Sequence, residues 1–106
     1  MRDDSFKEYV IDLFTGISGI EIKRMFGGWG VYKDESFFAL ISDGELYFKV
    51  DKNSKTDYTA YDSHPFVYTR KGKQVELSFW LVPEEVMEDR DKLFDWVIIS
   101  SNINKK

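Results

Sequence analysis

The first fifteen residues carry apolar side chains at the spacing of an α-helix. Residues three, four, seven and eight positions after Phe6 are also apolar, and such positions share one face of a helix. Gly16 follows the last of them, where glycine commonly ends a helix. The pattern therefore predicts a helix over about residues 4 to 15. Its apolar face consists of Phe6, Tyr9, Val10, Leu13 and Phe14.

From Gly19 onward the apolar residues recur at every second position, which is the period of a β-strand. Turn-forming residues separate these runs, and the pair Asp43 and Gly44 is a strong signal for a tight hairpin. The run from Phe37 to Ile41 is almost continuously apolar, which favours a central strand. The pattern predicts strands at residues 20–23, 29–32, 37–41 and 46–50.

Two more strands are predicted farther along the chain. Pro65 suits the first position of a strand that runs to Arg70, because that position tolerates a missing backbone N–H. Residues 71–73 form the tip of a hairpin, and residues 74–81 alternate between apolar and polar side chains for eight positions. We therefore expect these two strands to pair with each other.

Short helices are predicted on both sides of this hairpin. The polar segment 51–62 favours a short connecting helix with Asn53 or Ser54 as its N-terminal cap. Pro83 suits the first turn of another helix, and Asp89 can cap a longer one. The apolar face of this last helix would contain Leu93, Trp96, Val97 and Ser100.

The predicted order is helix, several strands, short helix, two strands and helix, without regular alternation of strands and helices. This order favours an α+β fold with two layers, in which an antiparallel β-sheet has helices packed on one face. A chain of 106 residues is the common size of a single domain with one core. Aromatic residues make up 17% of it, so large rings are expected to fill much of that core.

Charge and composition exclude several classes of protein. The net charge of −4 argues against strong autonomous binding to nucleic acid, which requires a basic surface. The absence of cysteine excludes disulfides, thiolate metal sites and a cysteine nucleophile. No apolar run approaches the roughly 20 residues that span a bilayer, so we expect a cytoplasmic protein without a membrane partner.

The residues that could support catalysis do not form a recognisable set. His64 is the only histidine and sits in a predicted loop, where a solvated side chain is more common than a general base. The carboxylates between residues 84 and 91 lack the spacing of a calcium loop, and capping of a helix explains them better. We therefore predict no catalytic residue, no cofactor and no metal site.

Three glycines in four positions, Gly27, Gly28 and Gly30, are the most unusual feature of the chain. They match neither a phosphate-binding loop nor a dinucleotide-binding motif. Glycine clusters of this kind permit backbone angles closed to other residues or a close approach of another backbone. We predict a structural role for these glycines at a bend or bulge.

Several residues are candidates for an interaction surface. Alternation in the strands 46–50 and 74–81 would turn Tyr47 and Trp80 away from the core, toward a wetter sheet face. Arg70, Lys71 and Lys73 could form a small basic patch, although a solvated turn is the commoner explanation of such a run. The predicted surface consists of Arg24, Trp29, Tyr47, Arg70, Lys73 and Trp80.

An ordered set of short motifs resembles the N-terminal domain of the TfoX family over about residues 5 to 100. The motifs are Lys23-Arg24-Met25-Phe26-Gly27-Gly28, Val31-Tyr32, Phe37-Phe38-Ala39-Leu40-Ile41, Leu46-Tyr47-Phe48-Lys49-Val50-Asp51, Phe66-Val67-Tyr68 and Pro83-Glu84-Glu85-Val86.

The resemblance implies a two-layer α+β fold and, from the competence regulators in the family, a role in regulating genes for DNA uptake together with the cyclic-AMP receptor protein. Full-length regulators continue into a C-terminal helical domain. We therefore expect residues 1–106 to be a single stand-alone domain of this family without that second domain.

The residues and the resemblance leave three functional hypotheses. The first is a non-enzymatic protein-interaction module that regulates transcription or competence, with an edge strand that would also permit a homodimer. The second is a DNA-binding accessory protein centred on Arg24, Arg70, Lys71 and Lys73, although we expect direct DNA binding to be weak or absent. The third is a small-ligand domain with a pocket between sheet and helices and a carboxylate from Glu84 or Glu85.

Overall fold

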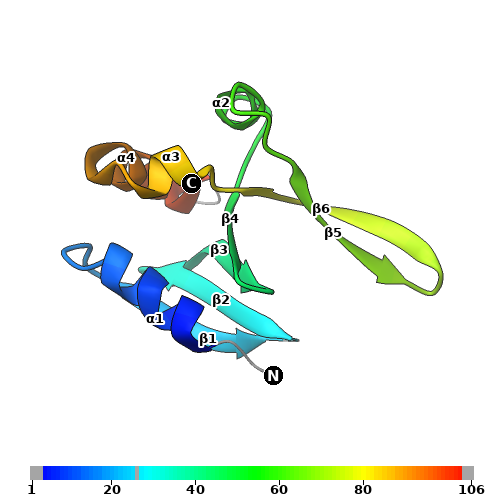
Figure 1. Ribbon diagram of the computed structural model, residues 1–106, viewed down its shortest axis with the longest axis horizontal. Helices are drawn as coiled ribbons and strands as arrows, with labels where there is room; N and C mark the ends of the chain where they lie inside the picture. Colours follow the sequence, from blue (N-terminus) through cyan, green and yellow to red (C-terminus); the bar gives the residue numbers. More distant parts are fainter. Residues whose placement is uncertain (1–3, 26, 104–106) are drawn as a thin grey trace.

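A computed structural model describes residues 4–25 and 27–103 of the chain. Its elements follow the predicted order, with a helical start, a strand-rich middle and a helical end (Figure 1). The elements are α1 (Asp4–Leu13), β1 (Ile20–Met25), β2 (Gly28–Lys33), β3 (Ser36–Ser42), β4 (Glu45–Lys49), α2 (Lys55–Thr59), β5 (Pro65–Arg70), β6 (Lys73–Leu81), α3 (Glu84–Met87) and α4 (Arg90–Asn102).

The six strands form one antiparallel sheet in the order β1-β2-β3-β4-β6-β5. The apolar strand β3 lies in the middle of the sheet with β4 beside it, as its sequence predicts. Strands β1 and β5 are the two edges. The β5–β6 hairpin extends away from the remainder of the molecule (Figure 1). The predicted α+β class with an antiparallel sheet is confirmed.

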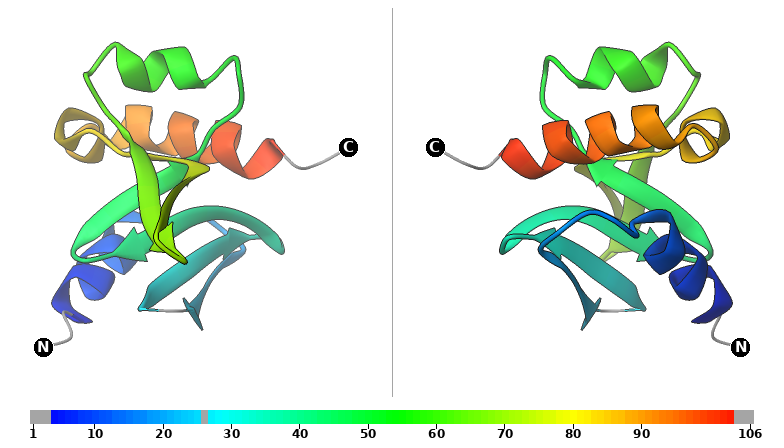
Figure 2. Two further views of the ribbon diagram at one scale, coloured as in Figure 1. Left: turned by 90° about the vertical axis from the view of Figure 1, so that its right-hand side faces the viewer. Right: turned by 90° about the vertical axis from the view of Figure 1, so that its left-hand side faces the viewer.

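Helices α1 and α4 cover the same face of the sheet, because buried side chains from both enter one apolar cluster with the strands (Figure 2). Three phenylalanine rings form its centre. Phe14, just after α1, lies 6.0 Å from Phe38 of β3 and 6.3 Å from Phe48 of β4, measured between ring centroids. Full burial of such a side chain contributes about 2 to 3 kcal/mol. The prediction of helices on one face is therefore confirmed.

A β-bulge in β3 lets two neighbouring residues enter this cluster. Val31 of β2 pairs with Ala39 while Tyr32 pairs with Phe37, so Phe38 has no partner across the strand pair. Both Phe38 and Ala39 are completely buried in the cluster. Phe37 instead contacts Phe79 on the other side of the sheet, at 5.0 Å between centroids. The extra residue thus adds a second side chain to the core.

Helix α4 begins as predicted. The side chain of Asp89 accepts a hydrogen bond from the backbone N–H of Lys92. Ser54, one of the two predicted residues, occupies the N-cap position of α2, but its side chain makes no capping bond to that helix. The side chain of Asp51 instead caps the turn that precedes α2. Its Oδ1 accepts from the Ser54 N–H at 2.8 Å, and this backbone hydrogen bond lowers the pKa of Asp51. In return, the Asp51 N–H donates to Ser54 Oγ at 3.0 Å.

The short helix predicted within residues 51–62 is confirmed as α2, and Ser54 is its N-cap residue, but the side-chain capping bonds lie one turn before the helix. The hydroxyl of Ser54 accepts a hydrogen bond within this turn, and it does not bond to the backbone of α2. A reciprocal pair of side-chain bonds at three-residue spacing stabilises the turn. The connection from β4 into α2 is therefore fixed by Asp51.

The glycine cluster has two different structural roles. Gly27 has φ of +72° in the turn between β1 and β2, where an L-residue would be strained, while Phe26 lies outside the described residues. Gly28 and Gly30 are in β2. A methyl group on Gly28 would overlap the backbone carbonyl oxygen of Ile41, and one on Gly30 would meet the sulfur of Met25 at 2.8 Å. Close packing around β2 thus excludes larger side chains.

We predict that Gly28→Ala destabilises the domain more than Gly30→Ala. The neighbour of Gly28 is the backbone of β3, which cannot move without breaking strand pairing, whereas the neighbour of Gly30 is the end of a flexible methionine. Overpacking of this kind costs roughly 1 to 3 kcal/mol. Urea unfolding of the two variants measures the difference, and equal or reversed losses would contradict this explanation of the glycines.

Candidate functional site

The sheet face away from the helices is also largely apolar. Across β3, β4 and β6, Leu40 pairs with Tyr47, and Tyr47 pairs with Leu81. Tyr47 and Leu81 are adjacent in sequence to Phe48 and its partner Trp80, which lie on the helix side. Because successive side chains of a strand point to opposite faces, the first set points away from the helices. We call this side of the sheet the helix-free face.

A groove with a volume of about 750 Å³ opens on the helix-free face. Residues of both edge strands contribute to it, with Met25 from β1 and Phe66, Tyr68 and Arg70 from β5. Since these strands stand at opposite ends of the sheet, the sheet must curl toward this side. The middle of the groove is apolar and includes Phe37, Leu40 and Leu77.

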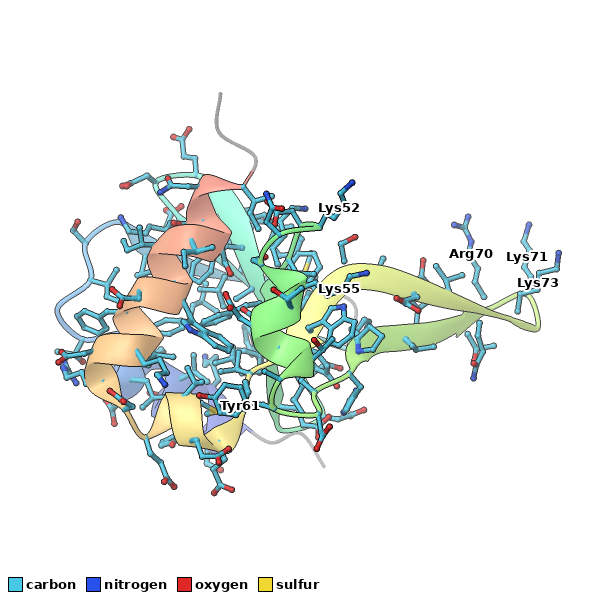
Figure 3. All side chains as sticks on the ribbon, turned by 90° about the horizontal axis from the view of Figure 1, so that it is seen from above. Lys52, Lys55, Tyr61, Arg70, Lys71 and Lys73 are labelled. Carbon is cyan, nitrogen blue, oxygen red and sulfur yellow. The ribbon has the colours of Figure 1, made fainter. Side chains whose placement is uncertain are left out.

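Positive charge lies at one end of the groove. Arg70 lines it at the end of β5, and Lys71 and Lys73 lie beside Arg70 at the tip of the hairpin (Figure 3). Within the described residues these three side chains make no ion pair or hydrogen bond to the protein. The groove therefore combines an apolar surface with an uncompensated positive charge at one end.

Tyr47 is buried and does not belong to the surface, which corrects the prediction from alternation. Its side chain is only 6% exposed, and the ring of Phe66 stands edge-on to it at 5.1 Å between centroids. The hydroxyl donates to Glu45 at 2.8 Å. Burial, together with this hydrogen bond, raises the pKa of Tyr47 well above its usual value. The face is covered here because the Phe66 side chain of β5 lies against the Tyr47 ring.

Trp80 lies on the opposite side of the sheet from Tyr47, so the two do not share one surface. It pairs with Phe48 and packs against the apolar core on the helix side. The Lys55 ammonium of α2 lies 5.8 Å from its ring centroid.

The prediction turned Trp80 outward because the residues that alternate with it in β6 are apolar, and such residues are normally assigned to the core. These residues include Leu77 and Leu81. Leu77 instead lines the groove, and Leu81 pairs with Tyr47 on the helix-free face. The outward assignment of Trp80 was therefore wrong.

Arg24 is separated from the other predicted cations. It pairs with Trp29 across β1 and β2 and stacks on that ring at 4.8 Å, while Lys7 of α1 approaches the same ring at 4.2 Å. Its position alternates with Met25, which lines the groove, so Arg24 points to the helix side. Arg70 pairs with Lys73 at the hairpin tip. The structure does not gather Arg24 with Arg70, Lys71 and Lys73.

Most of the space between sheet and helices is filled by the apolar cluster. A pocket of about 380 Å³ remains between the end of α1 and β1, and its lining, which includes Phe14, Ile17 and Ile22, contains no carboxylate. Glu84 and Glu85 are exposed in the first turn of α3, outside that core. His64 is exposed in the loop before β5, where its Nδ1 lies 3.1 Å from the Pro65 carbonyl oxygen. Among the described residues no three His, Cys, Asp or Glu side chains gather as metal ligands would. The small-ligand hypothesis therefore lacks the carboxylate that it required in such a pocket.

The groove residues Phe37, Leu40, Phe66 and Leu77 were not predicted from the sequence. One signal was present, since β3 is apolar at successive positions from Phe37 to Ile41 and so supplies both faces of the sheet. The curl that brings β5 opposite β1 has no local signal, because it depends on the twist of six paired strands.

Comparison with known proteins gives a family for the chain. The family model for the TfoX N-terminal domain matches residues 12–102. Protein Sxy of Escherichia coli strain K12 is 30% identical over 87 residues, which are 82% of this chain and 40% of that protein. The chain thus spans about two fifths of the length of this curated relative.

Within residues 4–25 and 27–103, no helix has the length and apolar character needed to cross a membrane.

Proposed function

The chain belongs to the TfoX N-terminal domain family, and from this premise we propose that it is a non-enzymatic protein-interaction module in gene regulation. The similarity to Protein Sxy makes competence for DNA uptake the process in which we expect it to act. The groove on the helix-free face would be the contact surface. A partner protein, and no substrate, would occupy it.

The apolar groove is the observation that supports this proposal. Large contiguous apolar patches are uncommon on monomeric proteins and mark interaction sites. Its lining offers rings and aliphatic chains for anchors of a partner, with Ser42, Tyr68 and Arg70 as the polar groups. Aromatic residues and arginine are enriched in the energetically important parts of protein interfaces. The groove has the composition of such a surface.

We predict that Tyr68→Lys abolishes capture of the native partner and that Val67→Thr, which adds no charge to the strand edge, does not. The two residues are adjacent on β5, and their side chains are 37% and 42% exposed. Tyr68 lines the groove, whereas Val67 pairs with Glu76 on the other face. Affinity capture from native lysate, quantified by mass spectrometry, compares the variants with the wild type.

The expected result is a transcription regulator or polymerase subunit retained by the wild type and by Val67→Thr. Removal of one central anchor typically lowers affinity by about 2 kcal/mol or more, enough to lose a protein during washing. Equal capture by both variants, with both folded by circular dichroism, would rule out the groove as the contact surface.

A second candidate function, DNA binding, is favoured by one observation. The hairpin tip exposes Arg70, Lys71 and Lys73, and none of them forms an ion pair within the described residues. Figure 3 shows them at a distance from the other labelled lysines, Lys52 and Lys55. Three lysine or arginine contacts to phosphates would give weak, sequence-independent binding that depends strongly on salt. The net charge of −4 opposes such binding.

We predict that any gel shift of duplex DNA at low salt disappears in the double variant Lys71→Glu, Lys73→Glu. With three phosphate contacts, affinity should fall by about 40-fold between 50 and 200 mM salt. Lys52→Glu, a charge reversal in the turn before α2, is the control and should retain any binding. Binding that survives both the double reversal and high salt would contradict a role for the hairpin tip.

A further inference from the structure

Strand β5 presents an unpaired edge beside the groove. It is the last strand of the sheet and pairs with β6 alone. One row of its backbone N–H and C=O groups therefore has no strand partner within the described residues. Such a row is a template for another extended chain. A role for this edge rests on the proposed function, because it specifies how a partner protein would occupy the groove.

The second half of β5 contains neither proline nor a bulge, and its one charged side chain is Arg70 at the end of the strand. Natural edges are protected by proline, bulges or charged side chains. In β5 the proline and the irregular pairing are confined to the start, between Pro65 and Val67. From Val67 to Arg70 the register is regular, and both Val67 and Tyr68 are exposed apolar residues. This half of the edge is open to pairing.

The same half of β5 borders the groove. Tyr68 and Arg70 are two residues apart and both line it, as expected for side chains on one face of a strand. A chain paired with β5 would also direct every second side chain to this face, next to Tyr68 and Arg70. Recognition by strand addition uses backbone hydrogen bonds for affinity and pockets for alternate side chains for specificity.

The positive charge at the end of β5 distinguishes between the chains that could pair with this edge. Arg70, with Lys71 and Lys73 beyond it, leaves positive charge at the end of the strand without an acidic partner in the described residues. A second copy of β5, from Pro65 to Arg70, contains no carboxylate and would bring a further arginine. An added strand with Asp or Glu at the end beside Arg70 would supply the missing charge.

We infer that the β5 edge accepts an extended segment of a partner protein by strand addition. The segment carries apolar side chains at alternate positions, which enter the groove, and one or more carboxylates at the end beside Arg70. Backbone bonds to β5 and the Arg70 ion pair together set its register.

A random dodecapeptide display library is the probe for this inference, selected against wild-type protein, Arg70→Glu and the control Lys52→Glu. The wild type and the control should enrich peptides with apolar residues at every second position and Asp or Glu at one end. Arg70→Glu should enrich Lys or Arg at that same end, since reversing the charge of one partner reverses the preference for the other. This exchange tests Arg70 independently of fold stability.

N-methylation of one enriched peptide then tests the backbone bonds. Methyl groups on alternate amides that face β5 should weaken binding by about tenfold for each lost hydrogen bond. Methyl groups on the other alternate amides should leave binding within about twofold, because those amides face away. Amide exchange of the protein should show new protection in β5 and unchanged exchange in β1.

Helical or unpatterned peptides, or an Arg70→Glu selection with unchanged acidic preference, would overturn the inference. A dimer of the wild type in sedimentation equilibrium that Tyr68→Lys dissociates would assign the edge to a second copy and would also overturn it. The inference would also be overturned if dodecanoate, a fatty-acid anion, bound in a manner that depends on Arg70 while no peptide bound.

These outcomes are separable from the proposed function. If native capture depends on Tyr68 but no alternating peptide is enriched, the groove binds a protein and strand addition is wrong. If capture is indifferent to Tyr68 and no peptide binds, both the proposed function and the inference fail.

Discussion

The contact among Phe14, Phe38 and Phe48 holds α1 to one side of the sheet and forms part of the apolar cluster in which α4 also packs, and the remaining arrangement depends on it. The rings come from the end of α1, β3 and β4, and their centroids lie 5.6 to 6.3 Å apart. The bulge in β3 makes this contact possible, because Phe38 and Ala39 both enter the core. The bulge also leaves Phe37 on the opposite face, where it packs against Phe79. One local irregularity thus supplies apolar side chains to both faces.

A sheet with two apolar faces must shield both from water, and α1 and α4 shield only one of them. Both helices pack on the Phe48 side. On the other side the sheet curls on itself, so that Phe66 shields Tyr47 but Leu40 and Leu77 still line an open groove. Exposed apolar surface of this extent raises the free energy of the isolated domain in water and favours association. The proposed function follows from that imbalance.

The positions of the helices and strands were predictable from the sequence. Which side chains of each strand meet the helices was only partly predictable. The period of Phe6, Val10 and Phe14 and the pair Asp43 and Gly44 are local signals that the structure confirms. In β6 the apolar phase, which includes Leu77 and Leu81, faces away from the helices, and the phase with Trp80 meets them. Periodicity assigned the apolar phase to the helix side because it cannot show that both faces of the sheet are apolar. Pairing of Phe48 with Trp80 decides which phase meets the helices, and pairing is a property of the folded sheet. The groove depends on that same long-range register.

Site-specific photocrosslinking in cells tests most directly whether the helix-free face is the contact surface. A benzophenone amino acid replaces Tyr68 in the groove or, as the control, Glu76 on the opposite face of β6. We expect an adduct with a different protein from position 68 and none from position 76. Adducts from position 76 alone, or equally from both positions, would contradict the assignment of the contact surface to the groove.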